Sequence, residues 1–130
     1  MRALLDTQCW LWMQVSPERL APAALELVQA AANDLYLSAA SCWEIAIKYA
    51  LGKLPLPMAP AEYVPSRLQT GGVLALPVSA RHALHVATLP AHHRDPFDRL
   101  LIAQAQLEGL DLITADRQLT AYDVRLILAA

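Results

Sequence analysis

The sequence predicts one α/β domain, residues 1–130, with a central parallel sheet of about four to five short strands covered by helices on both faces. The first reason is the stretch DPFDRLLIAQAQLEGLDLITAD, Asp95 to Asp116, which reads as a helix, a glycine-containing turn and a buried strand, half of a βαβ unit. The second is a hydrophobic content of 56%, rich in Ala and Leu, against ~45–50% in an average domain. The third is length, since 130 residues suffice for one domain that buries about two-thirds of its unfolded surface.

The stretch from Asp95 to Asp116 carries the clearest local signals. Asp95 is a good helix N-cap, and Pro96 suits the first helical position because its missing N–H would have no partner there. Gly109 supplies the left-handed residue that closes many helices, and Leu110–Thr114 is short, apolar and β-leaning. Asp116 then falls just past the carboxyl end of that strand, at the edge where ligands bind in open α/β sheets.

The segments that precede this unit alternate between strands and helices. Three prolines in the eight residues of KLPLPMAP, Lys53–Pro60, predict an extended loop. Pro65 lies within the helix expected after this loop and is expected to distort or shorten that helix. In chain order we predict strand Ala3–Leu5, helix Gln8–Met13, a covering helix from Ser16-Pro17-Glu18 to about Ala31, strand Leu35–Leu37, a helix capped by Ser38 or Ser41 that runs to about Leu51, loop Lys53–Pro60, helix Ala61–Thr70, strand Val73–Leu76, and a helix from Ser79 to about Thr88. After Asp116 come a short helix, Arg117–Tyr122, and a last strand, Val124–Leu128.

Charge and cysteine content restrict the function. The net charge is −2 and the pI near 6.0, so the chain lacks the basic character of a protein that holds nucleic acid by charge alone. Cys9 and Cys42 lack metal-ligand spacing and are interpreted as reduced, buried thiols. Three apolar residues between Arg2 and Asp6 are too few for a signal-peptide core, and no run approaches membrane-spanning length. We therefore expect a soluble, cytoplasmic protein.

Four carboxylates stand out, although each has an ordinary structural explanation. Asp6 and Asp116 each follow a strand and precede a helix, so either fits a simple N-cap. Asp98 in a first helical turn is favoured by the helix dipole, and Glu44 with Lys48 is a standard i, i+4 pair. Taken together, however, all four acids can converge above the same edge of one sheet.

Clustered carboxylates repel one another unless a divalent cation neutralises them. A site of oxygen ligands suits Mg²⁺ or Mn²⁺ rather than zinc. Such a cation activates water and stabilises charge on a phosphoryl group, which is the chemistry of metal-dependent phosphodiester hydrolysis.

Four ordered motifs carry a resemblance that spans essentially the whole chain. They are LLDT (Leu4 to Thr7), SCWEIAIKYALGKL (Ser41 to Leu54), DPFDRLLIAQA (Asp95 to Ala105) and LITAD (Leu112 to Asp116). Together they resemble PIN-domain ribonucleases, and among these the VapC toxins of VapBC toxin–antitoxin modules. The resemblance implies a Mg²⁺- or Mn²⁺-dependent endoribonuclease toxin with an RNA substrate, a small DNA-binding VapB-like antitoxin and a homodimeric state.

The resemblance also assigns roles to individual residues. The catalytic, metal-binding quartet is Asp6, Glu44, Asp98 and Asp116. The supporting residues that it implies are Thr7 and Thr114 as hydroxyl partners of the acids, Asp95 as the helix cap that sets up Asp98, and Arg99 as the basic residue that contacts substrate phosphate or balances the acids.

Three other functions compete with this one. A receiver-like phospho-acceptor domain also gathers acids at strand ends, but it needs paired acids after the first strand and a lysine after the last, whereas this chain has a single Asp6 and ends without that lysine. A haloacid-dehalogenase-like phosphatase needs Asp-x-Asp where this chain has Asp6-Thr7-Gln8. A catalytically silent PIN-like binding module remains open, although the complete quartet argues against it.

Histidines and tryptophans complete the candidates. His82 and His85 are interpreted as a partly exposed structural pair, and His92 and His93 as polar loop residues that can line the cleft. Trp10, Trp12 and Trp43 are assigned to core or dimer packing, with base stacking as the alternative.

Overall fold

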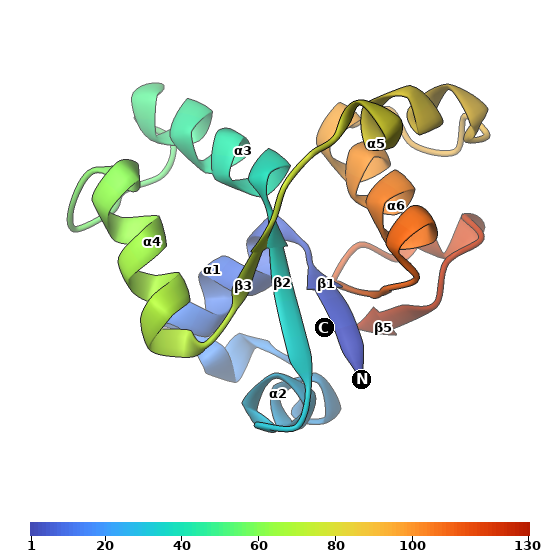
Figure 1. Ribbon diagram of the computed structural model, residues 1–130. Coiled ribbons are helices and arrows are strands. Elements are labelled where there is room, and N and C mark those ends of the chain that lie inside the picture. The colour runs from blue at the N-terminus through green and yellow to red at the C-terminus, as the bar shows by residue number, and fades with distance from the viewer.

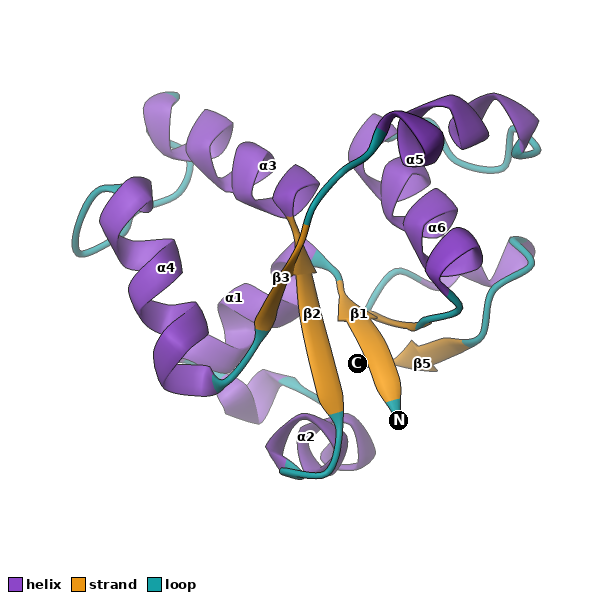
Figure 2. Cartoon of the chain, in the orientation of Figure 1, coloured by secondary structure: helices purple, strands orange, loops and turns teal.

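The computed structural model describes residues 1–130 and is built on a five-stranded sheet (Figures 1 and 2). Every neighbouring pair of strands is parallel, and the order is β3-β2-β1-β4-β5. The predicted parallel α/β fold is therefore confirmed. The strands are β1 (Arg2–Leu5), β2 (Asp34–Ser38), β3 (Leu74–Leu76), β4 (Asp111–Thr114) and β5 (Leu126–Leu128).

Six α-helices and three 3-10 turns connect the strands. The α-helices are α1 (Thr7–Val15), α2 (Pro22–Gln29), α3 (Ala39–Ala50), α4 (Pro60–Gly71), α5 (Ala80–His85) and α6 (Pro96–Glu108). The 3-10 turns are η1 (Pro17–Arg19), η2 (Val86–Thr88) and η3 (Arg117–Ala121). None of these helices is both long enough and apolar enough to cross a membrane.

The helices cover both faces of the sheet, because alternate side chains of a strand point to opposite faces. Ala3 and Leu5 of β1 belong to one core cluster, with residues of α1 to α4, whereas Leu4 belongs to a second, with residues of α6. Figure 1 shows the same division, with α1 to α4 on one side of the sheet and α5 and α6 on the other. A central strand buried on both faces explains why the run from Ala3 to Leu5 is apolar throughout.

The strand order places a topological switch point beside β1. The chain runs from β1 outward through β2 to β3, and then returns to the other side of β1 with β4 and β5. Ligands bind at such a switch, outside the carboxyl ends of the strands. Asp6 follows β1 and Asp116 lies two residues after β4, so the two acids flank this position. The order also differs from the 2-1-3-4-5 order of receiver domains, which argues against that alternative.

Three expectations for the elements were wrong. The helix expected from Ser16 is instead the single turn η1, and α2 begins only at Pro22, because Leu20 and Ala21 adopt extended conformations and the Ala21 N–H donates to the carbonyl of Ala129. Pro65 neither ends nor shortens α4, which continues to Gly71. The last strand, β5, begins at Leu126 rather than Val124, whereas the short helix expected before it is present as η3.

Candidate active site

A pocket of about 350 Å³ opens at the carboxyl edge of the sheet, beside the switch point. It is mainly polar, since only two of its ten lining residues are hydrophobic. The four predicted acids all line it, and Asp95 is a fifth. The lining residues are Asp6, Thr7, Gln8, Leu11, Glu44, Lys48, Asp95, Asp98, Ala115 and Asp116.

Asp6 is held by both of its carboxylate oxygens. Oδ1 accepts the backbone N–H of Cys9 at 2.7 Å, so Asp6 is indeed the N-cap of α1, and Oδ2 accepts the hydroxyl of Thr114. The Thr114 hydroxyl oxygen in turn accepts the backbone N–H of Asp116 at 3.0 Å. Thr114 thus connects the ends of β1 and β4. Because each carboxylate oxygen has two lone pairs, Asp6 can serve as a cap and still bind a cation.

Glu44 projects from the second turn of α3 toward the same pocket. The hydroxyl of Thr7 donates to its Oε1 at 2.6 Å, and Ser41 Oγ lies 2.9 Å from the Thr7 hydroxyl. A hydroxyl has one proton, so Ser41 donates to Thr7 while Thr7 donates to Glu44. Oε2 of Glu44 lies 2.8 Å from Nζ of Lys48, one turn along α3. The i, i+4 pair therefore exists, and both of its residues line the acidic pocket.

Asp98 lies in the first turn of α6, and Asp95 is the N-cap of that helix. Oδ1 of Asp95 accepts the backbone N–H groups of Phe97 at 2.8 Å and Asp98 at 3.3 Å. The pKa of Asp98 is raised to about 7, first by burial and then by the negative charge of Asp95, with smaller contributions from Asp6 and Glu44; His93 opposes the rise. A cation would favour the ionised form of this carboxyl group.

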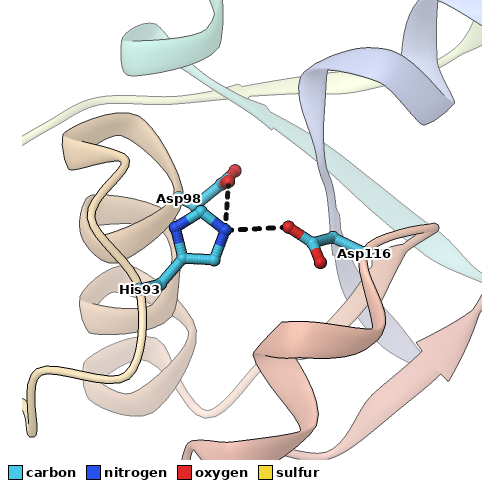
Figure 3. Close-up of side chains that lie close together, drawn as sticks. All are labelled: His93, Asp98 and Asp116. Carbon is cyan, nitrogen blue, oxygen red and sulfur yellow. Dashed lines mark hydrogen bonds and ion pairs between the residues drawn. The ribbon is translucent and has the colours of Figure 1, made fainter.

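Asp116 and Asp98 both lie beside the same nitrogen, Nε2, of His93 (Figure 3). Nε2 of His93 lies 2.9 Å from Oδ2 of Asp116 and 3.5 Å from Oδ2 of Asp98. The other oxygen of Asp116 accepts the N–H of Gln118 at 2.9 Å and caps η3. His93, Asp98 and Asp116 form a compact group whose candidate ligand atoms all lie within 4.8 Å of one another.

The expected role of Arg99 is not supported by its contacts. Its guanidinium donates to the carbonyl oxygens of Val86, Leu89 and Pro90 and to the hydroxyl of Tyr122. Arg99 does not line the pocket, because these acceptors hold it over the segment that precedes α6. The basic side chain of the pocket is Lys48.

The remaining histidines are structural. His82 caps α5 together with Ser79, and its Nε2 lies 2.8 Å from Glu108; at 3% exposure it is buried, not partly exposed as expected. His85 contacts Gln106. The ring of His92 packs edge-on against Tyr122, and His92 is not among the residues that line the acidic pocket.

The tryptophans divide between core and surface. Trp10 is fully buried and Trp12 packs against the same core cluster, so both have the packing role that was expected. Trp43 is 63% exposed and packs edge-on against Phe97. The thiols of Cys9 and Cys42 are free, and burial raises the pKa of both.

Ser41 and Lys48 were not predicted as members of the site. His93 was expected to be able to line the cleft, but its contact with Asp116 was not predicted. Lys48 had a detectable signal, because a residue four positions after Glu44 lies on the same helical face. Ser41, three positions before Glu44, had the same kind of signal. His93 had none, because the direction of its side chain depends on an irregular loop.

The donor set suits a hard divalent cation, since every pocket carboxylate retains lone pairs beyond those in its hydrogen bonds. The family model of the PIN domain matches residues 3–125 of this chain. The chain belongs to the PIN-domain family. This membership confirms the resemblance seen in the motifs and covers nearly the whole chain.

This PIN domain is similar to one relative in sequence and to several solved structures in fold. The chain is 51% identical over 59 residues to Ribonuclease VapC16 of Mycobacterium tuberculosis, a match that covers 45% of this chain and 42% of that protein. The structure is similar to that of VapBC2 from Rickettsia felis bound to a promoter DNA fragment, with a TM-score of 0.70, 18% identity and full coverage of both chains.

A second solved structure supports the same fold. It is VapBC-1 from nontypeable Haemophilus influenzae, with a TM-score of 0.64 and 20% identity over 98% of each chain. FitAcB from Neisseria gonorrhoeae matches with a TM-score of 0.62 and 24% identity over 98% of this chain and 96% of that one. Because these three structures are less than 25% identical to the chain, their similarity establishes its fold alone.

Proposed function

We propose that this PIN domain is a metal-dependent endoribonuclease that acts as the toxin of a toxin–antitoxin module in the cytoplasm. The observation that carries the proposal is the convergence of Asp6, Glu44, Asp98 and Asp116 on one open pocket, from four different elements. The name of the relative Ribonuclease VapC16 supports RNA as the substrate. Mg²⁺ or Mn²⁺ is the proposed cation, because the pocket offers oxygen donors.

The residues of the pocket divide the work of phosphodiester hydrolysis. When bound, a divalent cation would lower the pKa of its water and neutralise charge on the phosphoryl group. Asp6, Glu44, Asp98 and Asp116 are the residues that would hold it. Thr7 and Thr114 orient Glu44 and Asp6 through hydrogen bonds, so that these carboxylates need not reorganise during the reaction.

Lys48 supplies the positive charge of the pocket. Its Nζ lies 2.8 Å from Glu44 and its side chain is about half exposed, so a phosphate oxygen of the RNA can reach it. An ammonium group there offsets part of the repulsion between the acids and a polyanionic substrate. This assignment replaces the expected phosphate contact of Arg99.

The nuclease assignment is tested by incubating purified protein with total cellular RNA in Mn²⁺, Mg²⁺ or excess chelator. We expect cleavage with either cation and none with chelator. Glu44→Gln keeps the size of the side chain and removes one charge, and it should reduce cleavage to background; Glu26→Gln makes the same change on an exposed residue of α2 and should cleave normally. Cleavage that survives chelation, or no cleavage under any condition, would contradict the proposal.

A small DNA-binding antitoxin is the proposed inhibitor, and the solved VapBC complexes support a partner of this kind. A second pocket of about 240 Å³, mainly apolar, adjoins the acidic one and shares Gln8 and Leu11 with it. An antitoxin segment seated there would run beside the proline-rich loop and extend a basic side chain, preferably Arg, to the carboxylates. The other lining residues are Trp12, Val15, Ser16, Arg19, Leu54, Pro55, Leu56 and Tyr63.

Competition between this basic side chain and the cation gives a direct test. Two ligands that compete for one site must weaken each other. Mn²⁺ titrated against the purified toxin–antitoxin complex should therefore bind with lower apparent affinity than to the toxin alone. Equal affinities would mean that the antitoxin inhibits elsewhere, for example by covering the RNA path.

The unit is proposed to be a homodimer. The large apolar side chains of Trp43 on α3 and of Leu51, the C-cap of α3, are each 63% exposed, and burial of such residues stabilises interfaces. Sedimentation of the purified chain should give twice the monomer mass, and Trp43→Ser should shift it toward the monomer. A monomeric wild-type protein would contradict this part of the proposal.

A further inference from the structure

We propose that His93 is a positioning residue of the acidic site: an imidazole whose Nε2–H donates to the carboxylate of Asp116 beside that of Asp98, and not a ligand of the metal. The inference rests on the proposed nuclease function, and nothing in the sequence pattern assigned this role. Figure 3 shows both carboxylates on the same edge of the ring, with the two dashed lines meeting at one nitrogen. The ring is well shielded, with 13% of its side-chain surface exposed.

The position of the imidazole proton follows from the other ring nitrogen. Nδ1 of His93 accepts the backbone N–H of Asp95 at 3.0 Å. A backbone amide can only donate, so Nδ1 must present a lone pair, and the proton of the neutral ring lies on Nε2. Nε2–H then donates to Oδ2 of Asp116 at 2.9 Å. Oδ2 of Asp98 lies 3.5 Å from the same nitrogen, which is a close electrostatic contact rather than a second hydrogen bond.

The same hydrogen bond argues against metal binding by His93. A histidine that binds a metal through Nε2 needs a lone pair there, and its Nδ1–H usually donates to a carboxylate or carbonyl. Moving the proton to Nδ1 would direct it at the N–H of Asp95, which cannot accept it. In addition, His93 does not line the acidic pocket, whereas Asp98 and Asp116 do. The compact group of His93 and the two acids is therefore held by the hydrogen bond from His93 to Asp116.

The loop that carries His93 is anchored for this purpose. The backbone N–H of His93 donates to the hydroxyl of Tyr122 at 2.9 Å, and Arg99 donates to the same hydroxyl at 3.1 Å. Arg99 also holds the carbonyl of Pro90 at 2.9 Å. Tyr122 is buried at 4% exposure, so the anchor belongs to the core. These contacts give Arg99 a function at a distance from the pocket: it fixes the segment that presents His93.

Asp116 needs such support more than the other acids. It lies on the loop between β4 and η3, and its side chain is 36% exposed. Gln118 holds one of its oxygens and His93 holds the other, so the plane of the carboxylate is fixed only when both donors are present. Loss of a hydrogen bond that orients a ligand typically costs 10–100-fold in metal affinity or activity.

The test compares His93→Ala, His93→Gln and His85→Ala. Glutamine can place an amide N–H near the position of Nε2, alanine cannot, and His85 bonds to Gln106 away from the acids. We expect His93→Ala to weaken Mn²⁺ binding and to lower kcat for RNA cleavage about 10–100-fold. The KM for RNA should stay within about twofold, since no substrate contact is lost. His93→Gln should recover most of both losses, and His85→Ala should match the wild type.

Two spectroscopic measurements separate the donor role from ligation and from a purely structural role. In the metal-free protein, nitrogen NMR of His93 should show a protonated Nε2 and an unprotonated Nδ1. In the Mn²⁺-loaded protein, electron spin-echo spectra should show no directly bound imidazole nitrogen.

Either of two spectroscopic results would overturn the proposal: a Mn²⁺-bound imidazole nitrogen that is present in the wild type and absent in His93→Gln, or a proton on Nδ1 of His93. Two functional results would also overturn it: His93→Gln that binds Mn²⁺ and cleaves RNA no better than His93→Ala, or His93→Ala that equals the wild type in both. If the wild type neither binds Mn²⁺ nor cleaves RNA, the nuclease function itself fails. The NMR result still decides the protonation of His93 in that case.

Discussion

The two halves of the acidic pocket are built in different ways. The half formed by Asp6 and Glu44 is supported by the hydroxyl groups of Thr114 and Thr7, and all of these residues lie at strand ends or in the first two turns of helices. The half formed by Asp98 and Asp116 is supported instead by His93, from an irregular loop.

Exposure and charge follow the same division. Asp6 is 7% exposed, whereas the Asp116 side chain is 36% exposed. The pKa of Asp98, which lies beside Asp95 and has no hydroxyl donor, is raised by burial and by the negative charge of Asp95. The first half is therefore set by the sheet, while the second depends on how the loop is held. Substitutions in the two halves should differ accordingly, which leads to four predictions.

The largest expected effect is loss of activity without loss of the fold, after substitutions in the half of the pocket formed by Asp98 and Asp116. Asp98→Asn and Asp116→Asn should each reduce RNA cleavage and growth inhibition to background, because each removes a proposed cation ligand. The melting temperature should stay unchanged or rise slightly, because each substitution removes one repelling carboxylate. Thermal unfolding and cleavage measured on the same preparation test this prediction, and joint loss of folding and activity would favour a capping role alone.

The second effect is a dependence of stability on pH that comes from Asp98. Its pKa is about 7 in the folded protein and 3.8 in the reference state, so the folded state binds more protons between these values. In the absence of metal, the free energy of unfolding should therefore fall by at most a few kcal/mol as pH rises from about 4 to about 7. The contribution of Asp98 should be constant above that pH. Denaturant unfolding at pH 5 and 8 should show this loss in the wild type and in the exposed-site control Asp123→Asn, but not in Asp98→Asn. A loss of the same size in Asp98→Asn would assign it to another group.

The third effect concerns the half of the pocket formed by Asp6 and Glu44, which the hydroxyl groups of Thr114 and Thr7 support. Thr114→Val keeps the shape of a fully buried side chain but leaves Oδ2 of Asp6 without its donor, which should cost about 1–3 kcal/mol of stability and lower cleavage. Thr120→Val, at an exposed position of η3, is the matched control and should change little. Chemical denaturation distinguishes the two, and a neutral Thr114→Val would show that Asp6 does not depend on this bond.

The same division decides what the sequence could predict. Asp6 and Asp116 were found because strand ends of a parallel sheet share one edge, and Asp98 and Glu44 because helical position fixes their direction. The place of His93 was not predictable in this way, since it depends on Arg99 and Tyr122 holding a loop, and these contacts join residues far apart in the chain. Arg99 was misplaced for the same reason: its position beside Asp98 in sequence says nothing of the carbonyl groups that hold it.

The smallest expected effect is that of Asp95→Ala, and it tests whether the cap or the charge of Asp95 matters. The substitution removes the acceptor for the N–H groups of Phe97 and Asp98, which should cost about 1 kcal/mol of stability. It keeps the backbone N–H that donates to His93, so the imidazole should retain its proton on Nε2. Catalysis should therefore fall much less than in Asp98→Asn, and the pKa of Asp98 should decrease because a neighbouring negative charge is lost. A fully folded but inactive Asp95→Ala would transfer the catalytic role from Asp98 to Asp95.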